Sequence, residues 1–253
     1  MWTFSELRNG VTIDKATVKQ LTAAFRLEHE GQPNCIGYWA GKGLPLPLER
    51  IGLRYSSGLL TPKDYLSHFK NITHHRILLR SVKPHNGASL CRCCHRHTED
   101  TMHLASCSKL RKVWIIFNRL VAASHSQTPL TRALIFHALE PDGSLLPQGL
   151  SALHLITWKL LIYHLTLVDT ENRRFNHEQV WDQALRRFEV RANALAHKVY
   201  RQSIAHRGKG LRLKEPEADN RKLAPLAHIN EFGHITYCDS LQDEFKRTRA
   251  DPQ

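Results

Sequence analysis

Four of the six cysteines lie in one short segment, 91–107, which reads CRCCHRHTEDTMHLASC. Cys91 and Cys94 form a C-x2-C pair, a spacing that lets two thiolates of one tight turn reach the same tetrahedral ion. His103 and Cys107 are four residues apart, so on a helix they would project from the same face. The pattern C-x2-C-x8-H-x3-C therefore predicts one zinc ion held by these four side chains.

Other residues of the turn offer alternative ligands. Cys93 could pair with Cys91 in a C-x-C arrangement, although its offset of one residue from Cys94 should point its side chain elsewhere. His95 and His97 are predicted to be exposed cations of a basic loop, and the whole cluster could instead be a set of reduced thiols without metal. A site closed by four protein ligands has no open position for water, so the predicted zinc is structural and not catalytic.

The placement of the cysteines and the N-terminal sequence indicate a reducing compartment. Cys35 and Cys238 lie far from the other four, and clustered cysteines favour metal binding over disulfides. The sequence MWTFSELRNG has no basic stretch followed by an apolar run, so we expect an intracellular protein, nuclear or cytoplasmic, that is not secreted. The most apolar segment, 151–168, contains Lys159 and is short for a membrane span, which favours a buried helix.

Basic residues exceed acidic ones across the chain, and most strongly around the cysteines. Lys and Arg number 36 against 23 Asp and Glu, which gives a net charge of +13. Between residues 61 and 123 the counts are 11 and 3, so this quarter of the chain holds +8 of that charge. Such an excess favours a polyanionic partner, RNA or DNA, and the alternative is a solvated face that keeps the protein soluble. The predicted nucleic-acid contacts are Arg76, Arg80, Lys83, Arg92, Arg96, Lys109, Arg111 and Lys112.

Apolar residues at helical spacing predict the elements that position these side chains. We expect helices over 14–28, from 61 to 81 in two pieces, and over 110–121, 150–168 and 177–204. The helix after the cysteines carries an apolar stripe that includes Trp114 and should lean on the metal site. Because the segment 150–168 is apolar on opposite faces, it is predicted to be a central, wholly packed helix. The predicted fold class is therefore mainly α, with one zinc-stapled turn.

The sequence divides into three predicted parts. Residues 1–60 hold a helix and a Gly/Pro-rich connecting region, whose Tyr38–Trp39 pair we expect to pack on the core. Residues 61–206 form the zinc-containing helical domain. Residues 207–253 are predicted to be a flexible linker and tail, in which LAPLAHINEFGHITYCDS could form a short strand or helix docked elsewhere.

The run LCRCCHRHTEDTMHLASCSKLRKVW resembles the zinc-binding region that follows the polymerase in non-LTR retrotransposon reverse transcriptases. In that family C-x2-C, an acidic stretch, His-Leu, Cys and a Trp recur in this order. The resemblance implies the same four ligands, and it matches Glu99 and Asp100 to the acidic stretch and Trp114 to the Trp of the family pattern. It extends over about 50–180, because a basic lead-in precedes the cysteines and ITWKLLIYHLTLVDTENRRF, which follows them, is also similar to the family. The chain departs from the family in a His-to-Cys gap one residue shorter, and in His95 where a Gly is common.

The resemblance implies a nucleic-acid-binding module without its polymerase. Two-metal nucleotidyl transfer needs clustered carboxylates, and the nearest sequence, Tyr237-Cys238-Asp239-Ser240, lacks the second acid. No GK[ST] loop, GxSxG elbow or HExxH helix occurs either, so no catalytic residue and no enzyme are predicted. The alternative function is a zinc-stabilised helical scaffold that binds protein partners through the helix 177–206. An enzyme whose site these motifs do not reveal is the third hypothesis.

Overall fold

The computed structural model describes residues 34–44, 59–64, 66, 89–207 and 217–250. The chain divides into two compact units, Met1–Ser56 and Ser57–Gln253. In the first unit, helix α2 (Asn34–Gly41) lies within the predicted connecting region, and its Trp39 is buried with Tyr38 edge-on to it. The helix predicted over 14–28 and most of the region 61–81 lie outside the described residues.

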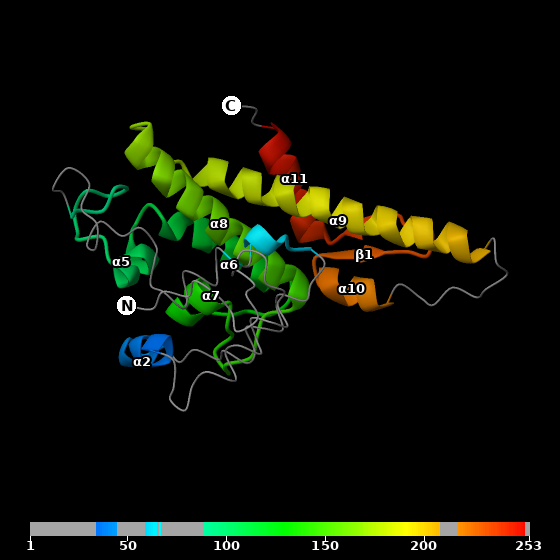
Figure 1. The fold of residues 1–253 in the computed structure, drawn as a ribbon, viewed down its shortest axis with the longest axis horizontal. Helices are drawn as coiled ribbons and strands as arrows, with labels where there is room; N and C mark the ends of the chain where they lie inside the picture. Colours follow the sequence, from blue (N-terminus) through cyan, green and yellow to red (C-terminus); the bar gives the residue numbers. More distant parts are fainter. Residues whose placement is uncertain (1–33, 45–58, 65, 67–88, 208–216, 251–253) are drawn as a thin grey trace, which may run out of the picture. The chain divides into compact units, whose positions relative to one another are not determined.

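The second unit is mainly α-helical, as predicted (Figure 1). Its elements are α5 (Thr101–Ser106), α6 (Arg111–Ser124), α7 (Arg132–His137), α8 (Gln148–Thr170), α9 (His177–Arg207), α10 (Glu217–Leu223), β1 (Ala227–Ile229), β2 (Ile235–Tyr237) and α11 (Asp239–Ala250). The predicted helices over 110–121, 150–168 and 177–204 correspond to α6, α8 and α9. The two short strands form one antiparallel hairpin, with Ala227 opposite Tyr237.

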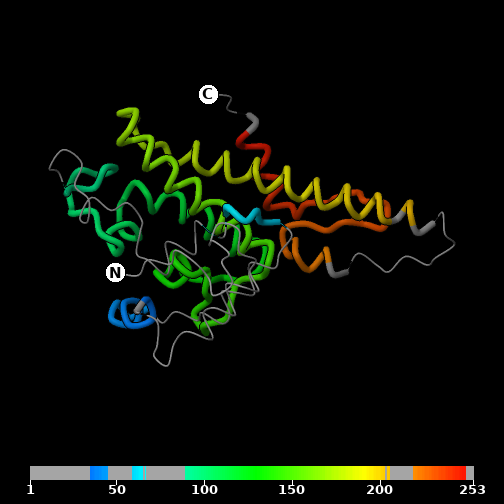
Figure 2. Tube along the Cα trace, viewed as in Figure 1, coloured from blue at the N-terminus to red at the C-terminus, as the bar shows by residue number. Residues whose placement is uncertain are grey.

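Helix α8 lies at the centre of this unit, as its apolar sequence predicts. By length and composition it could cross a membrane, but most of its residues are buried against the rest of the protein. The chain reverses direction after Thr170, and α9 returns along α8 (Figure 2). Asn172, with φ 51°, occupies the left-handed region at this reversal, where a short polar side chain is tolerated.

An aromatic cluster joins α6 to α8. The buried indole of Trp114 lies 5.2 Å from the His154 ring and 5.1 Å from that of Trp158, measured between ring centroids. The Trp158 Nε1–H donates to the carbonyl oxygen of Ile135 at 2.6 Å, and His154 Nε2 donates to the same oxygen at 2.8 Å. These two bonds attach α7 to the face of α8 on which Trp114 packs.

A buried carboxylate ties the start of the unit to α8 and α9. Residues 62–64 are helical, and Asp64 caps this turn by accepting bonds from the Thr61 backbone N–H at 2.8 Å and hydroxyl at 2.6 Å. Lys159 of α8 forms an ion pair with Asp64 at 2.7 Å. Arg191 of α9 forms a second ion pair with the same carboxylate at 2.6 Å. Burial alone would raise the pKa of Asp64, but the bonds from Lys159 and Thr61 and the charge of Arg191 outweigh it and lower that pKa.

Part of the segment predicted to be a flexible linker and tail forms regular elements. Residues 217–250 form α10, the hairpin and α11, and Leu223, Leu226 and Leu241 are buried. Gly149 of α8 allows this docking, because a Cβ there would lie 2.2 Å from the Leu223 carbonyl oxygen. The short docked strand that the sequence allows is therefore found. Residues on both sides of the predicted boundary at 206/207 belong to one compact unit, because the apolar residues of 217–250 are buried against the helices.

Asp64→Asn should destabilise the protein by about 3 kcal/mol near neutral pH, because Lys159 and Arg191 would then face a neutral amide. A lowered pKa contributes stability that is present above the unfolded value of about 3.9 and is lost as pH falls through the folded value. Urea unfolding should therefore show a difference between parent and variant that shrinks below pH 4. The control Asp243→Asn removes an exposed acid and should have almost no effect. A difference that grows on acidification would contradict this role for Asp64.

Candidate metal centre

A tight turn at residues 91–98 presents the first two cysteines. The Cys91 N–H donates to the His97 carbonyl oxygen, and the His95 N–H donates to that of Cys91, both at 2.8 Å. Leu90 and Thr98 form an isolated antiparallel β-bridge at the base of the turn. His95 has φ 55°, in the left-handed region that favours glycine. His95 therefore stands at a position of the turn where a glycine would fit without strain.

Helix α5 presents the other two ligands. Asp100 caps this helix, its Oδ1 accepting from the His103 N–H at 2.7 Å. The Cys107 N–H donates to the His103 carbonyl oxygen at 2.6 Å, so the two residues are one helical turn apart, as predicted. The Cys107 carbonyl in turn accepts from the Arg111 N–H at 2.8 Å, which places α6 directly after the site.

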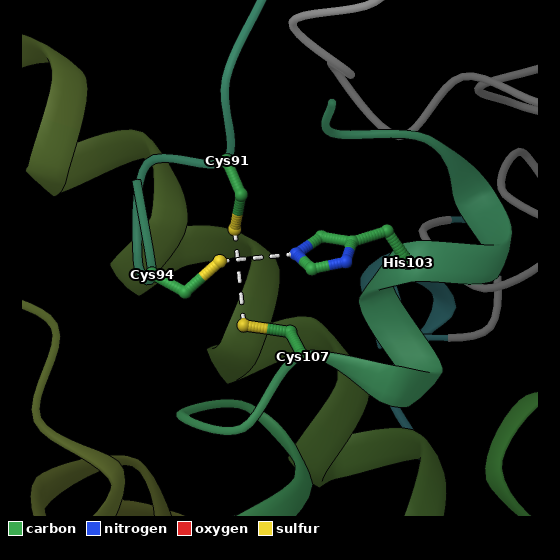
Figure 3. A group of neighbouring side chains, drawn as sticks. All are labelled: Cys91, Cys94, His103 and Cys107. Atoms are coloured by element: carbon green, nitrogen blue, oxygen red, sulfur yellow. Dashed lines mark hydrogen bonds between the residues drawn. The ribbon is translucent and has the colours of Figure 1, made fainter. Parts of the chain in front are cut away.

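The four predicted ligand atoms converge on one point (Figure 3). The sulfur atoms of Cys91, Cys94 and Cys107 and the ring nitrogen of His103 all lie within 4.8 Å of one another. The sulfurs of Cys91 and Cys107 are 3.8 Å apart, and Cys94 Sγ is 3.3 Å from His103 Nε2. A tetrahedral ion with Zn–S bonds of about 2.3 Å and Zn–N bonds of about 2.0 Å separates such pairs by roughly 3.8 and 3.5 Å. These side chains could therefore hold one metal ion.

Backbone donors surround the two buried sulfurs. Cys91 and Cys107 have no solvent exposure, and N–H groups of Cys93 and Cys94 point at the first sulfur, with those of Lys109 and Leu110 at the second. The hydrogen bond from Cys107 lowers the pKa of the Cys91 thiol and raises that of Cys107, since the pair shares its proton. Such donors stabilise the thiolate that a metal requires.

The alternative ligands stay outside the group. Cys93 is half-buried, and its hydrogen bond with Cys91, followed by burial, raises the pKa of its thiol. His95 and His97 are exposed, as predicted for cations of a basic loop. The structure therefore favours Cys94 over Cys93 as the partner of Cys91.

The sequence predicts that Arg92 contacts nucleic acid, but the structure places this residue in the interior. Its side chain is only 3% exposed, and its Nε lies 3.1 and 3.0 Å from the two carboxylate oxygens of Glu99, which is wholly buried. Nη1 of the same guanidinium reaches Asp169 at 2.7 Å and the Leu165 carbonyl at 3.1 Å, both on α8. Burial would lower the pKa of Arg92, but these acids raise it. Arg92 thus fastens the metal turn to α8, and no phosphate can reach it.

The other predicted contacts around the turn lie on the surface. Arg96, Lys109, Arg111 and Lys112 are exposed, whereas Arg76, Arg80 and Lys83 lie outside the described residues. The fold adds a neighbour that the sequence did not reveal, the start of α9. Burial and the positive charges of Lys112 and Lys109 outweigh the nearby Glu178 carboxylate and lower the pKa of His177 there. Residues some 65 positions apart in the chain thus lie close together, because α9 packs against both α8 and α6.

Comparisons with protein-family models, curated proteins and solved structures find no match for this chain. The likeness to reverse-transcriptase zinc-binding regions therefore rests on the residues quoted above. The geometry of the four ligands stands independently of that likeness.

Purified protein should contain one zinc per chain by elemental analysis. Cys94→Ser should lose this metal, because three ligands remain, whereas the matched change Cys93→Ser should keep it. Circular dichroism of both variants checks that their helix content is comparable. Equal metal loss in the two variants would show that the ligand assignment is wrong.

Glu99→Gln should destabilise the protein by about 3 to 5 kcal/mol, since it leaves the buried guanidinium of Arg92 without its closest counter-charge. Glu171→Gln is the matched control, because Glu171 and its partner Arg173 are both exposed, and it should cost less than about 1 kcal/mol. Urea unfolding of the zinc-loaded protein measures both values. Similar values for the two variants would refute a structural role for the Arg92 pair.

Proposed function

We propose that this chain is a zinc-stabilised module that binds RNA or DNA through phosphate groups and catalyses no reaction itself. The observation that carries the proposal is a group of exposed cations beside the metal turn: Arg96, Lys109, Arg111 and Lys112. None of these four forms an ion pair within the described part of the chain, so their charges are available to a polyanion. Phosphate contacts need only such charges at suitable positions.

Zinc is the metal that the ligand set favours. Three thiolates and one imidazole at tetrahedral spacing suit zinc better than oxygen-seeking magnesium or calcium. Since the ion brings two positive charges to three thiolates, the loaded centre carries only about one negative charge and leaves the surface basic. Four protein ligands leave no position for substrate, so the proposed role of the zinc is to hold the turn, and with it the cations, against α8. Free thiols of this kind fit the reducing interior of a cell.

A helical scaffold for a protein partner remains the second candidate function. Helix α9 favours it, because Val190, Tyr200 and Ile204 are large apolar residues exposed along this helix. The excess of free cations at the metal turn gives the nucleic-acid proposal precedence, since a protein partner would need a matching acidic face.

The test compares Lys109→Ala/Lys112→Ala with Lys246→Ala/Arg247→Ala, which removes the same charge from α11. Arg92 is unsuitable because its replacement would disturb the fold. The first double variant should bind a labelled RNA and a DNA duplex more weakly, by a similar factor for every sequence. Each lost contact should also reduce the slope of log K against log salt by about 0.7 to 0.9.

The control double variant should keep the parent affinity and slope, and both variants should keep one zinc. If the Lys109/Lys112 variant binds as tightly as the parent and with the same salt slope, these cations do not contact phosphate. The scaffold function would then be favoured.

A further inference from the structure

The tip of the β1–β2 hairpin rests on the C-terminal half of α9. Gly233 lies at this contact with φ +77°, and a Cβ added there would be 2.5 Å from Tyr200 Cβ and 2.9 Å from the Ala196 carbonyl oxygen. Only glycine fits so close to a helix backbone in this conformation. Phe232 and His234, which flank Gly233 in the chain, are therefore held close to Tyr200.

Rings gather on the surface at this contact. Phe232 and Tyr200 are each 45% exposed, and His234 and His197 are exposed beside them. The ring centroids of His197 and Tyr200 are 6.3 Å apart, and those of Phe232 and His234 are 6.4 Å apart. We refer to these four residues as the aromatic platform. Large exposed rings that are held in place by a backbone contact are typical of a binding surface.

The surroundings of the platform are basic. The sequence from 197 to 207 contains three basic residues and no acidic one, and Arg201 is exposed next to Tyr200 in the chain. Tyr200 and Arg201 each share a helix face with His197, which lies three and four positions before them. The hairpin tip contributes one acid, Glu231. This charge is complementary to a polyanion and unsuited to a basic or neutral protein partner.

We propose that the aromatic platform stacks the bases of single-stranded RNA or DNA, with Arg201 beside it to contact the phosphates. The inference rests on the proposed function, to which it adds a preference for single strands. Stacking on aromatic rings needs exposed base faces, which a duplex hides between its base pairs. The cations at the metal turn can bind either form, so discrimination between them comes from the platform.

The experiment uses the zinc-loaded full chain with a labelled oligouridylate, an oligothymidylate and a mixed-sequence DNA duplex of equal length. Tyr200→Ala retains the Cα and Cβ atoms that Gly233 contacts, so it removes the ring without unseating the hairpin. This variant and Phe232→Ala should each weaken binding to the single strands by roughly 5- to 150-fold and leave duplex binding nearly unchanged. Tyr200→Trp should restore single-strand binding. Tyr163→Ala, which removes a tyrosine that is 52% exposed on α8, is the matched control and should have no effect.

The outcomes separate this inference from the proposed function. If both platform variants bind single strands like the parent while Lys109→Ala/Lys112→Ala binds weakly, the platform is overturned and the proposed function stands. If the parent binds none of the probes even at low salt, both fail. If Phe232→Ala and Val190→Ala instead abolish a concentration-dependent self-association and leave nucleic-acid binding intact, the exposed face of α9 is a protein contact and the platform is again overturned.

Discussion

The second unit is organised by the need to cover most of the surface of α8. A helix of 23 residues that is apolar all round cannot face water, and its neighbours are placed accordingly. Helix α9 lies along it, α6 and α7 meet it at the Trp114–Trp158 cluster, and α10 crosses its first turn at Gly149. The metal turn is one more part of this cover, because Arg92 reaches the Leu165 carbonyl and Asp169 near the end of α8.

Two buried charge groups decide how the covering elements are oriented. Asp64 forms ion pairs with Lys159 and Arg191. Arg92 forms ion pairs with Glu99 and Asp169. Apolar packing is non-directional, whereas a guanidinium or a carboxylate is satisfied only when its partners stand at defined positions. The cost of burying these ions is offset by several hydrogen bonds on each, and removing one partner would leave the other unpaired. A basic residue in a basic segment can therefore be part of the core, as Arg92 is.

Length sets α9 apart from the helix it covers. Its 31 residues span about 46 Å, against about 34 Å for the 23 residues of α8, so its C-terminal part has no α8 to pack against. The hairpin covers part of that end and leaves the aromatic platform at the surface. The proposed phosphate contacts lie near the other end, where His177 meets Lys109 and Lys112. A strand that touched both surfaces would run along about 35 Å of helix, which makes α9 the scaffold of both proposals.

The sequence by itself determined the candidate metal ligands and the long helices. Cys91 and Cys94 share one turn and His103 and Cys107 one helical turn, so local geometry alone brings each pair together, and periodic apolar residues mark α6, α8 and α9 because each must bury a face. Tertiary structure decided which charges are free. Arg92 and Arg96 look alike in the sequence, yet the first is buried against Glu99 and Asp169 and the second is exposed. Tertiary structure likewise decided that residues 217–250 dock on α6, α8 and α9, and that Gly233 lies against Tyr200. These contacts join residues far apart in the chain, and no local spacing records which distant backbone a glycine or an arginine will meet.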